Sequence, residues 1–563
     1  MKKTSAQILL SFALLALSES CSKNFLEIKP QASLTTELLA DKKGLDGLLV
    51  AGYNAMDGCT IGETTVAWRS SFVNWLYGEV ASDNAHKGSE ITDQPEMIPI
   101  QYWRDLTADN TYMTTLWRAV YEGVSRANDV LKTLKVATGL SEADVNRIEG
   151  EALYLRGYFY FLGKRYFNMI PWIDENTEDF RVPNTTDIWP NIENDFKRAI
   201  DLLPEEPAQP GSAHLNAARA GLAKCYMFQS KFSEAKPVLD EIINSGRYIL
   251  WPNFYDNWNT AYEGKTSGTE AIFQIQNSLN DASGRENGKT LYLSGIAQIQ
   301  SCCGFNQPSQ DLVNAYKTTP EGLPMLDNYN ETDLKSDDGL LSSDPFTPAT
   351  DLLDPRLDHT VGRRGIPYLD FGIFPGKEWV VDQATYGPYR LKKGMSTSAQ
   401  QAITSVTSRT TVNYNIYRFA HILLMRAECA VEENDLATAL DLVNKVRIRA
   451  RDGEIVKNDD GTPAANYKIE PYPSFSSQDY ARKAVRFETR LEMATEGDRW
   501  YDLVRWGIAE PTITEYFAKE GAKRALMKAS AAYKADYLPI PGAEIELSKD
   551  DNGAPTLTQN PNY

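Results

Sequence analysis

Two segments far apart in the chain, residues 217–245 and 419–449, share one helix-turn-helix pattern. Small residues occupy equivalent places in both: Ala223, Cys225 and Ala235 in the first, and Ala427, Cys429 and Ala439 in the second. A short turn separates the two helices of each segment, Ser230-Lys231 or Asn434-Asp435. This is the pattern of a tetratricopeptide repeat, in which neighbouring helix pairs stack and bury a shared core. The pattern predicts that Cys225 and Cys429 are small buried core residues without thiol chemistry.

Amphipathic periodicity predicts two further long helices, residues 109–135 and 141–168. Apolar side chains recur every three or four positions, as at Leu116, Val120 and Val124, which places them on one face of a helix. Ser141, followed three residues later by Asp144, resembles a helix-capping start for the second segment.

The sequence between the two repeats has a different character. From Trp251 to Arg418 it is rich in Gly, Pro, Asn and Asp, with short β-like runs at Ala271–Gln276 and Trp379–Val381. A continuous solenoid does not tolerate such an interval between neighbouring repeats. We therefore predict a mostly α fold, with a tetratricopeptide-like helical-repeat framework over about residues 30–250 and 410–563. A large loop-rich insertion containing short strands, about residues 251–410, is the expected ligand-binding part, because loops carry function more often than frameworks do.

Charge and residue spacing exclude several classes of site. The formal net charge is −18 at pH 7, so the chain repels a phosphate backbone, and we expect no nucleic-acid partner. The four histidines have no metal-ligand spacing, and the six cysteines form no CxxC pair. We therefore expect no metal and no cofactor.

Residues 1–20 predict an export signal. Lys2 and Lys3 precede the apolar run Ile8–Leu17, which is too short to span a bilayer permanently. Cys21 follows Ser18-Glu19-Ser20, which predicts cleavage before Cys21 and acylation of its thiol. Acyl chains at this position would anchor the protein to a membrane. The alternative is an ordinary secretory signal with an incidental cysteine.

Several segments, in order along the chain, carry a family resemblance. They are CSKNFLEIKP (21–30), EALYLRGYFYFLGKRYFNMIPW (151–172), YRFAHILLMRAECAVEENDLATALDLVNKVRIRA (417–450), VRFETRLEMATEGDRWYDLVRWG (485–507), YLPIP (537–541) and LTQNPNY (557–563). Together they resemble the SusD/RagB-like nutrient-binding outer-membrane lipoproteins of Gram-negative gut bacteria.

The resemblance implies one SusD/RagB-like domain over residues 21–563, after the signal peptide. It implies a lipid-anchored outer-membrane protein that faces the cell exterior and is not an enzyme. Such a protein captures an oligosaccharide and delivers it to a partner TonB-dependent, SusC-like transporter. The helical repeats are expected to face the transporter, and the irregular region to carry the ligand site.

Sugar binding requires flat apolar faces against C–H surfaces and planar polar groups for hydroxyls. Trp75 is the candidate ring, with a core role as the alternative. The stretch from Glu79 to Asp83 resembles the family's polar turn near the ligand site, which makes Asp83 a candidate. Asp57, in the turn-like Met56-Asp57-Gly58, is placed either to reach a hydroxyl or to cap a helix.

Three further features are candidates for sugar contact. Cys302 and Cys303 are adjacent, and a disulfide between them would form a compact apolar plate for a sugar ring; two thiols without a ligand role, or pairing with Cys59, are the alternatives. Arg363 can donate two parallel hydrogen bonds to vicinal hydroxyls, and a surface salt bridge is its ordinary alternative. Tyr389 follows in YGPY and adds a ring.

The charged segment 485–507 resembles a catalytic cluster at first inspection. Its like-charge pairs at i,i+4, Arg486 with Arg490 and Glu492 with Glu496, need opposite charges from elsewhere in the chain. We interpret the segment as a structural ion-pair network, with Trp500 as core.

Other functions remain as alternatives. Capture of a peptide suits an acidic chain. A glycoside hydrolase needs two carboxylates across a cleft, and no residue pair in the sequence is singled out for that role. A purely structural repeat adaptor would bind another protein and no sugar. The sequence has no GxSxG motif and no Gly-rich phosphate loop.

Overall fold

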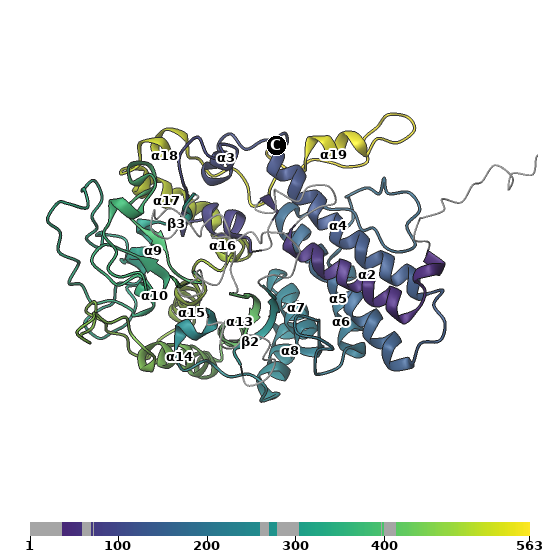
Figure 1. Ribbon diagram of the computed structural model, residues 1–563, viewed down its shortest axis with the longest axis horizontal. Helices are drawn as coiled ribbons and strands as arrows, with labels where there is room; N and C mark the ends of the chain where they lie inside the picture. Colours follow the sequence, from purple (N-terminus) through teal and green to yellow (C-terminus); the bar gives the residue numbers. More distant parts are fainter. Residues whose placement is uncertain are drawn as a thin grey trace, which may run out of the picture.

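The computed structural model describes residues 36–58, 69–70, 73–258, 269–277, 303–395, 397–398 and 412–563. Within these ranges, no helix is both long and apolar enough to cross a membrane. One group of helices extends from the centre to the right of Figure 1. It comprises α2 (Lys42–Asn54), α4 (Thr111–Leu134), α5 (Glu142–Phe167), α6 (Trp189–Leu202), α7 (Leu215–Phe228) and α8 (Phe232–Asn244). The short elements before and between them are η2 (Thr36–Leu39), η3 (Ala55–Asp57), the π-helix η5 (Trp75–Val80), β1 (Ala85–Gly88) and α3 (Met97–Tyr102).

Helices α4 and α5 confirm the two long helices predicted from periodicity. The side chain of Ser141 caps α5 by accepting a hydrogen bond from the backbone N–H of Asp144 at 3.1 Å, as its sequence position predicts. The two helices approach closely at Gly123 of α4, where an added Cβ would lie 2.4 Å from the Phe159 ring. A larger residue at position 123 would therefore push the helices apart.

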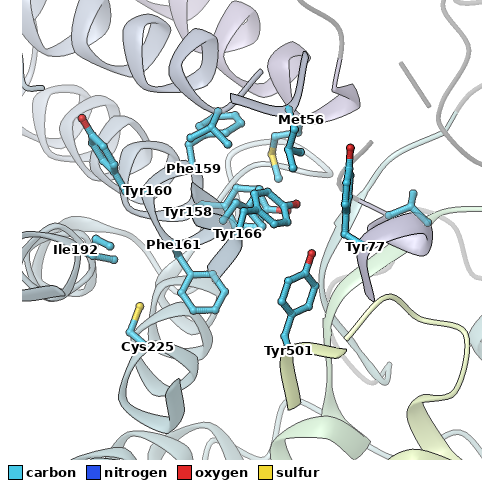
Figure 2. Close-up of a cluster of buried hydrophobic side chains, with 14 of the residues drawn as sticks. Met56, Tyr77, Tyr158, Phe159, Tyr160, Phe161, Tyr166, Ile192, Cys225 and Tyr501 are labelled. Carbon is cyan, nitrogen blue, oxygen red and sulfur yellow. The ribbon is translucent and has the colours of Figure 1, made fainter. Parts of the chain in front are cut away.

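Helix α5 is the centre of the main hydrophobic core. Nearly every residue from Gly150 to Phe167 is buried, so the helix is covered on all sides. Its aromatic side chains reach toward other elements, as Figure 2 shows for Tyr166 near Tyr77 and Tyr501. The ring centroid of Tyr166 is 5.8 Å from that of each of these two tyrosines. This core therefore joins the first group of helices to segments from elsewhere in the chain.

Two helix pairs are the predicted repeats, α7 with α8 and α13 (Phe419–Glu432) with α14 (Leu436–Asp452). The turn of each pair contains a residue in the left-handed region, Ser230 (φ 55°) or Asn434 (φ 60°). The two pairs pack directly on each other, since Lys236 of α8 forms an ion pair with Glu433 at 2.7 Å. Cys225 and Cys429 are buried free cysteines, which confirms their predicted core role. The helices of the second half are α13 (Phe419–Glu432), α14 (Leu436–Asp452), α15 (Gln478–Met493), α16 (Arg499–Arg505), α17 (Ala509–Gly521), α18 (Ala525–Ser530) and α19 (Gly542–Leu547).

The packing of α8 on α13 shows how the chain keeps a continuous repeat framework. The intervening region leaves after α8 and returns before α13, so the two repeats are neighbours in space. The predicted fold class, a mostly α repeat framework with a loop-rich insertion containing short strands, is confirmed. The described part of the insertion contains η6 (Phe254–Trp258), β2 (Ala271–Ile275), β3 (Phe305–Pro308), α9 (Gln310–Ala315), α10 (Arg356–Thr360), β4 (Val361–Gly362), η9 (Lys377–Trp379), α11 (Gln383–Tyr386), β5 (Arg390–Leu391) and β6 (Tyr414–Arg418).

The strands of the described residues pair as antiparallel two-stranded ribbons, β1 with β3, β2 with β6 and β4 with β5. The strand predicted at Ala271–Gln276 is confirmed as β2. The strand predicted at Trp379–Val381 is wrong, because Trp379 ends a 3-10 turn in which its N–H donates to the carbonyl of Gly376 at 2.9 Å. The apolar residues of this run pack in a local cluster with Tyr368 and Phe374, so tertiary burial explains their hydrophobicity without a strand.

The C-terminal tail returns to the first group of helices. The amide of Asn560 donates hydrogen bonds to the carbonyls of Phe167 (2.8 Å) and Leu538 (2.7 Å). The N–H of Gly542 bonds to Ala108 at 3.0 Å, and α19 and the C terminus lie beside α4 (Figure 1). The C-terminal tail therefore packs against the same layer of helices as α4 and α5.

Candidate functional site

Several chain segments that are distant in sequence meet at one place, which we call the strand junction: residues 73–75, 276–277, 303–305 and 412–414. The Tyr414 hydroxyl lies 3.1 Å from the carbonyl oxygen of Val73. The N–H of Asn277 donates to the side-chain oxygen of Asn413 at 2.9 Å. The rings of Trp75 and Phe305 are 5.7 Å apart at their centroids. These contacts link the π-helix η5 with the β2–β6 ribbon and the start of β3.

A ladder of side-chain amides lines the β2–β6 side of the strand junction. Gln274 donates to Asn415 at 2.7 Å, and Asn413 donates to Gln276 at 2.9 Å. Alternate residues of a strand point to the same side, which is why the amides align. Gln276 is exposed, and its amide nitrogen donates no hydrogen bond to any residue in the described part of the chain. This planar group is therefore available to a hydroxyl-rich ligand.

The predicted residues Trp75 and Cys303 lie at the strand junction, and Asp57 lies in η3. Asp57 is the last residue of η3 and is half-buried. Trp75 is only 1% exposed, so its ring packs inside the junction. Cys303 is half-buried and disulfide-bonded, and its partner is neither Cys225 nor Cys429, which are free. The partner lies outside the described residues, as do Cys21 and Cys302, so the vicinal disulfide remains a prediction.

The predicted residue Asp83 is buried behind the strand junction. Its carboxylate accepts two hydrogen bonds from Arg499, both 2.8 Å, and lies 3.1 Å from a guanidinium nitrogen of Arg490. Burial alone would raise the pKa of Asp83, but the two guanidiniums lower it to about 2. In this structure both oxygens of Asp83 are occupied by protein groups.

Replacing Asp83 with asparagine is expected to flatten the acid dependence of stability. Because the pKa of Asp83 is lowered in the folded protein, its stabilisation is present above about pH 4 and is lost as the pH falls toward 2. From pH 5 to pH 3, the unfolding free energy of the parent should fall by about 1 kcal/mol more than that of the Asp83→Asn variant. Urea unfolding at both pH values measures this difference. Asp441→Asn, which removes an exposed partner of Lys445, is the control. An equal fall of the unfolding free energy with pH in all three proteins would contradict the lowered pKa of Asp83.

The predicted residues Arg363 and Tyr389 are also held by protein groups. Arg363 forms a bidentate pair with Asp358, at 2.6 and 2.8 Å. The Tyr389 hydroxyl donates to the side-chain oxygen of Gln310 at 2.9 Å, and burial raises its pKa. The structure thus places Trp75, Asp83, Arg363 and Tyr389 in the interior, and leaves Asp57 and Cys303 partly accessible.

Glu79 of η5 connects the strand junction to the charged segment 485–507. Its carboxylate accepts hydrogen bonds from the backbone N–H groups of Gly497 (2.6 Å) and Thr495 (3.1 Å) and from the amide of Asn84 (2.8 Å). Burial raises the pKa of Glu79, and these hydrogen bonds oppose that rise. The carboxylate therefore fixes the turn after α15 against the π-helix.

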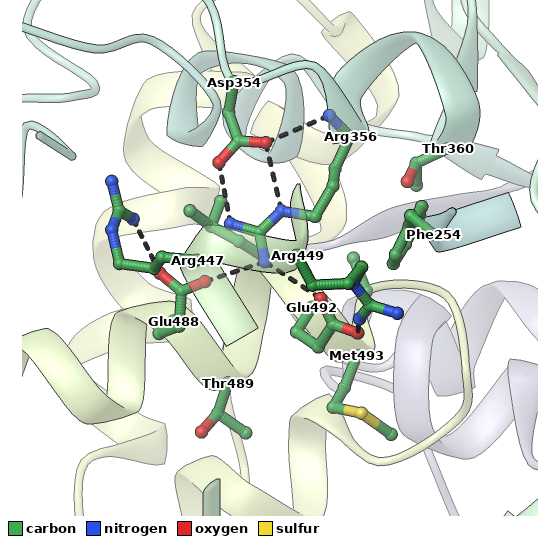
Figure 3. Close-up of polar contacts among 12 residues, drawn as sticks. Phe254, Asp354, Arg356, Thr360, Arg447, Arg449, Glu488, Thr489, Glu492 and Met493 are labelled. Atoms are coloured by element: carbon green, nitrogen blue, oxygen red, sulfur yellow. Dashed lines mark hydrogen bonds and ion pairs between the residues drawn. The ribbon is translucent and has the colours of Figure 1, made fainter. Parts of the chain in front are cut away.

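The rest of the charged segment forms the buried ion-pair network that the sequence predicts. Glu492 lies between Arg356 (2.9 Å) and Arg418 (2.7 Å) and also contacts Arg449. Figure 3 shows how Arg356 additionally bridges Asp354 and the α15 carboxylates. In the described part of the chain the network comprises the carboxylates Glu270, Asp354, Glu488, Glu492 and Glu496 and the cations Arg356, Lys393, Arg418, Arg447 and Arg449. Balanced charge and direct pairing give these residues a structural role.

The side-chain amides of the strand junction are candidate ligand contacts that were not predicted from the sequence. Gln274 and Gln276 alternate in QIQN (274–277), and Asn413 and Asn415 alternate in NYN (413–415). Alternating amides in two strand-like runs are the signal that could have found them. The described residues hold no group of three or more His, Cys, Asp or Glu side chains arranged for a metal ion.

The fold and the junction define a helical-repeat protein whose inserted region presents polar groups at the surface. A family model described as "SusD family" matches residues 269–563, and one described as "Starch-binding associating with outer membrane" matches residues 24–227. The chain therefore belongs to the SusD family.

Curated and solved relatives agree with this assignment. The chain is 23% identical to SusD-like protein P2 of Formosa agariphila, over 81% of each sequence. A SusD superfamily structure from Bacteroides vulgatus matches with a TM-score of 0.68 at 19% identity, covering 93% of this chain and 100% of that one. Surface glycan-binding protein A from Bacteroides thetaiotaomicron, in complex with laminarihexaose, matches with a TM-score of 0.65 at 21% identity, covering 93% and 100%. At these identities the structures show the shared fold.

Proposed function

We propose that this chain is a cell-surface lipoprotein that captures an oligosaccharide and delivers it to a partner TonB-dependent outer-membrane transporter. Membership of the SusD family carries the proposal. It is supported by the likeness to a surface glycan-binding protein solved with laminarihexaose. Acylation at Cys21 supplies the anchor to the outer membrane, with the ligand site facing the cell exterior. The chain acts by binding and is not an enzyme.

The strand junction is the proposed glycan site. The exposed amide of Gln276 offers a hydrogen-bonding group for sugar hydroxyls, and the half-buried carboxylate of Asp57 is proposed to reach the same ligand. Cys303, with Cys302 beside it in sequence, is proposed to add an apolar contact. The buried ring of Trp75 supports this surface by packing on Phe305.

Isothermal titration calorimetry of residues 22–563 against laminarihexaose, fructans, mannans and host-type glycans tests the proposal. We expect saturable binding to one glycan class without release of reducing sugar. Gln276→Ala and Asp57→Ala should each weaken that binding about three- to tenfold, the effect of losing one hydrogen bond to the ligand. Asn328→Ala removes another exposed amide outside the junction and should leave the affinity unchanged.

Other outcomes would replace the proposal. Binding of a peptide that Gln276→Ala weakens, with no binding of any glycan, would identify a peptide-capturing protein of the same family. Release of reducing sugar would identify a hydrolase. Binding that is equally insensitive to Gln276→Ala, Asp57→Ala and Asn328→Ala would move the glycan site away from the strand junction.

A further inference from the structure

A groove with a volume of about 620 Å³ lies between α4, the loop that follows α5 and the C-terminal segment around α19. These elements are separate from the strand junction. The groove is lined by polar and charged residues and by apolar ones, which include Trp117, Tyr121, Val124, Pro171, Ile173 and Leu557. An aliphatic and aromatic lining of this kind receives apolar side chains.

Two large apolar side chains stand exposed on different walls of the groove. Phe180, in the loop after α5, is 68% exposed, and Leu547, at the end of α19, is 69% exposed. Exposed apolar side chains beside an apolar groove mark surfaces that bind proteins. Leu547 is aliphatic and offers neither a flat ring nor a polar group to a sugar, but it suits contact with another apolar side chain.

The charged residues of the groove are mostly paired within the protein. Arg118 pairs with Glu544 at 2.9 Å, and Glu175 pairs with Lys135 at 3.0 Å. Asp129 of α4 lines the same groove but forms no ion pair or hydrogen bond with any residue in the ranges that the structure describes. Its side chain is exposed, so the carboxylate is accessible from solvent. A cation supplied from outside the chain would complete this site.

We propose that the groove docks a protein loop that carries an arginine or lysine beside an apolar side chain. The apolar side chain of the loop enters between Phe180 and Leu547, and its cation pairs with Asp129. Arginine suits this position because its guanidinium can bind a carboxylate in a bidentate manner. The proposal does not depend on glycan capture at the strand junction.

Calorimetry of residues 22–563 with capped tetrapeptides tests the proposal. The probes are acetyl-Leu-Arg-Phe-Arg-amide, its acidic analogue acetyl-Leu-Glu-Phe-Glu-amide and its polar analogue acetyl-Ser-Arg-Ser-Arg-amide. We expect saturable binding of the first probe only. Leu547→Asp and Asp129→Asn should each weaken it about tenfold, as for a central contact of a protein interface. Both side chains are exposed, so thermal unfolding should be unchanged.

Leu341→Asp is the matched control, because Leu341 is also exposed, at 51%, and does not line the groove. It should leave peptide binding intact, and none of the three variants should change binding of the glycan class identified by the panel above. The proposal is overturned if no probe binds, if the acidic probe binds as well as the basic one, or if Leu341→Asp weakens binding as much as Leu547→Asp. Loss of that glycan binding in Leu547→Asp would also overturn it, by making the groove a sugar site.

Discussion

Replacing Glu492 with glutamine is expected to lower the unfolding free energy by about 3–5 kcal/mol. The carboxylate of Glu492 is completely buried and contacts the guanidiniums of Arg356, Arg418 and Arg449. Glutamine keeps the shape but removes the negative charge, so buried cations lose a direct partner. Urea unfolding of residues 22–563, followed by tryptophan fluorescence, measures the change.

Glu515→Gln is the control for this variant. Glu515 forms an i,i+4 pair with Lys519 at 2.7 Å, and both side chains are exposed. Exposed pairs contribute at most about 1 kcal/mol, so this variant should unfold close to the parent. A Glu492→Gln protein as stable as the control would show that the remaining carboxylates compensate for the lost charge.

Replacing Gly78 with alanine is expected to cost about 3 kcal/mol or more, because the new Cβ would meet backbone and not a movable side chain. A Cβ at Gly78 would lie 2.0 Å from the carbonyl oxygen of Gly497. Gly497 is itself constrained, with φ at 91° and the carbonyl oxygen of Val73 only 2.2 Å from where its own Cβ would be. Two glycines thus let the π-helix η5 lie directly on the turn after α15. The urea midpoint of Gly78→Ala measures the effect.

Gly47→Ala is the matched control for Gly78→Ala. Gly47 lies within α2, and an added Cβ there would have no neighbour within 4 Å. Alanine favours a helix over glycine, so this variant should gain about 0.5–1 kcal/mol. The unfolding free energy is therefore expected to rise in Gly47→Ala and to fall in Gly78→Ala. A Gly78→Ala protein as stable as the parent would contradict the close backbone contact.

Periodicity and local chemistry were sufficient to predict the helical elements. The α4 and α5 segments have apolar residues every three or four positions, and Ser141 caps α5 as its position indicates. The wrong prediction of a strand at Trp379–Val381 has a clear cause. A short apolar run does not distinguish a strand from a buried turn, and contacts with Tyr368 and Phe374 decided the outcome.

The candidate site was harder to predict because burial depends on distant segments. Asp83 and Arg363 have the residue types that bind hydroxyls, but Arg499 and Asp358 occupy them inside the protein. No local sequence pattern indicates such a partner, because Arg499 is distant from Asp83 in the sequence. Gln276 and Asn413 were not predicted as site residues, because their amides come together only when β2 pairs with β6.

The repeat helices, their caps and turns, and the need of the charged segment for opposite charges can be predicted from local sequence. These features follow from interactions between residues a few positions apart, which periodicity and residue type report directly. Long-range packing determines that α8 packs on α13, that Glu492 contacts Arg356 and Arg418, and that the strand junction exposes Gln276 while burying Trp75. These outcomes depend on contacts between segments far apart in the chain, where many pairings satisfy the same local pattern and close packing selects one.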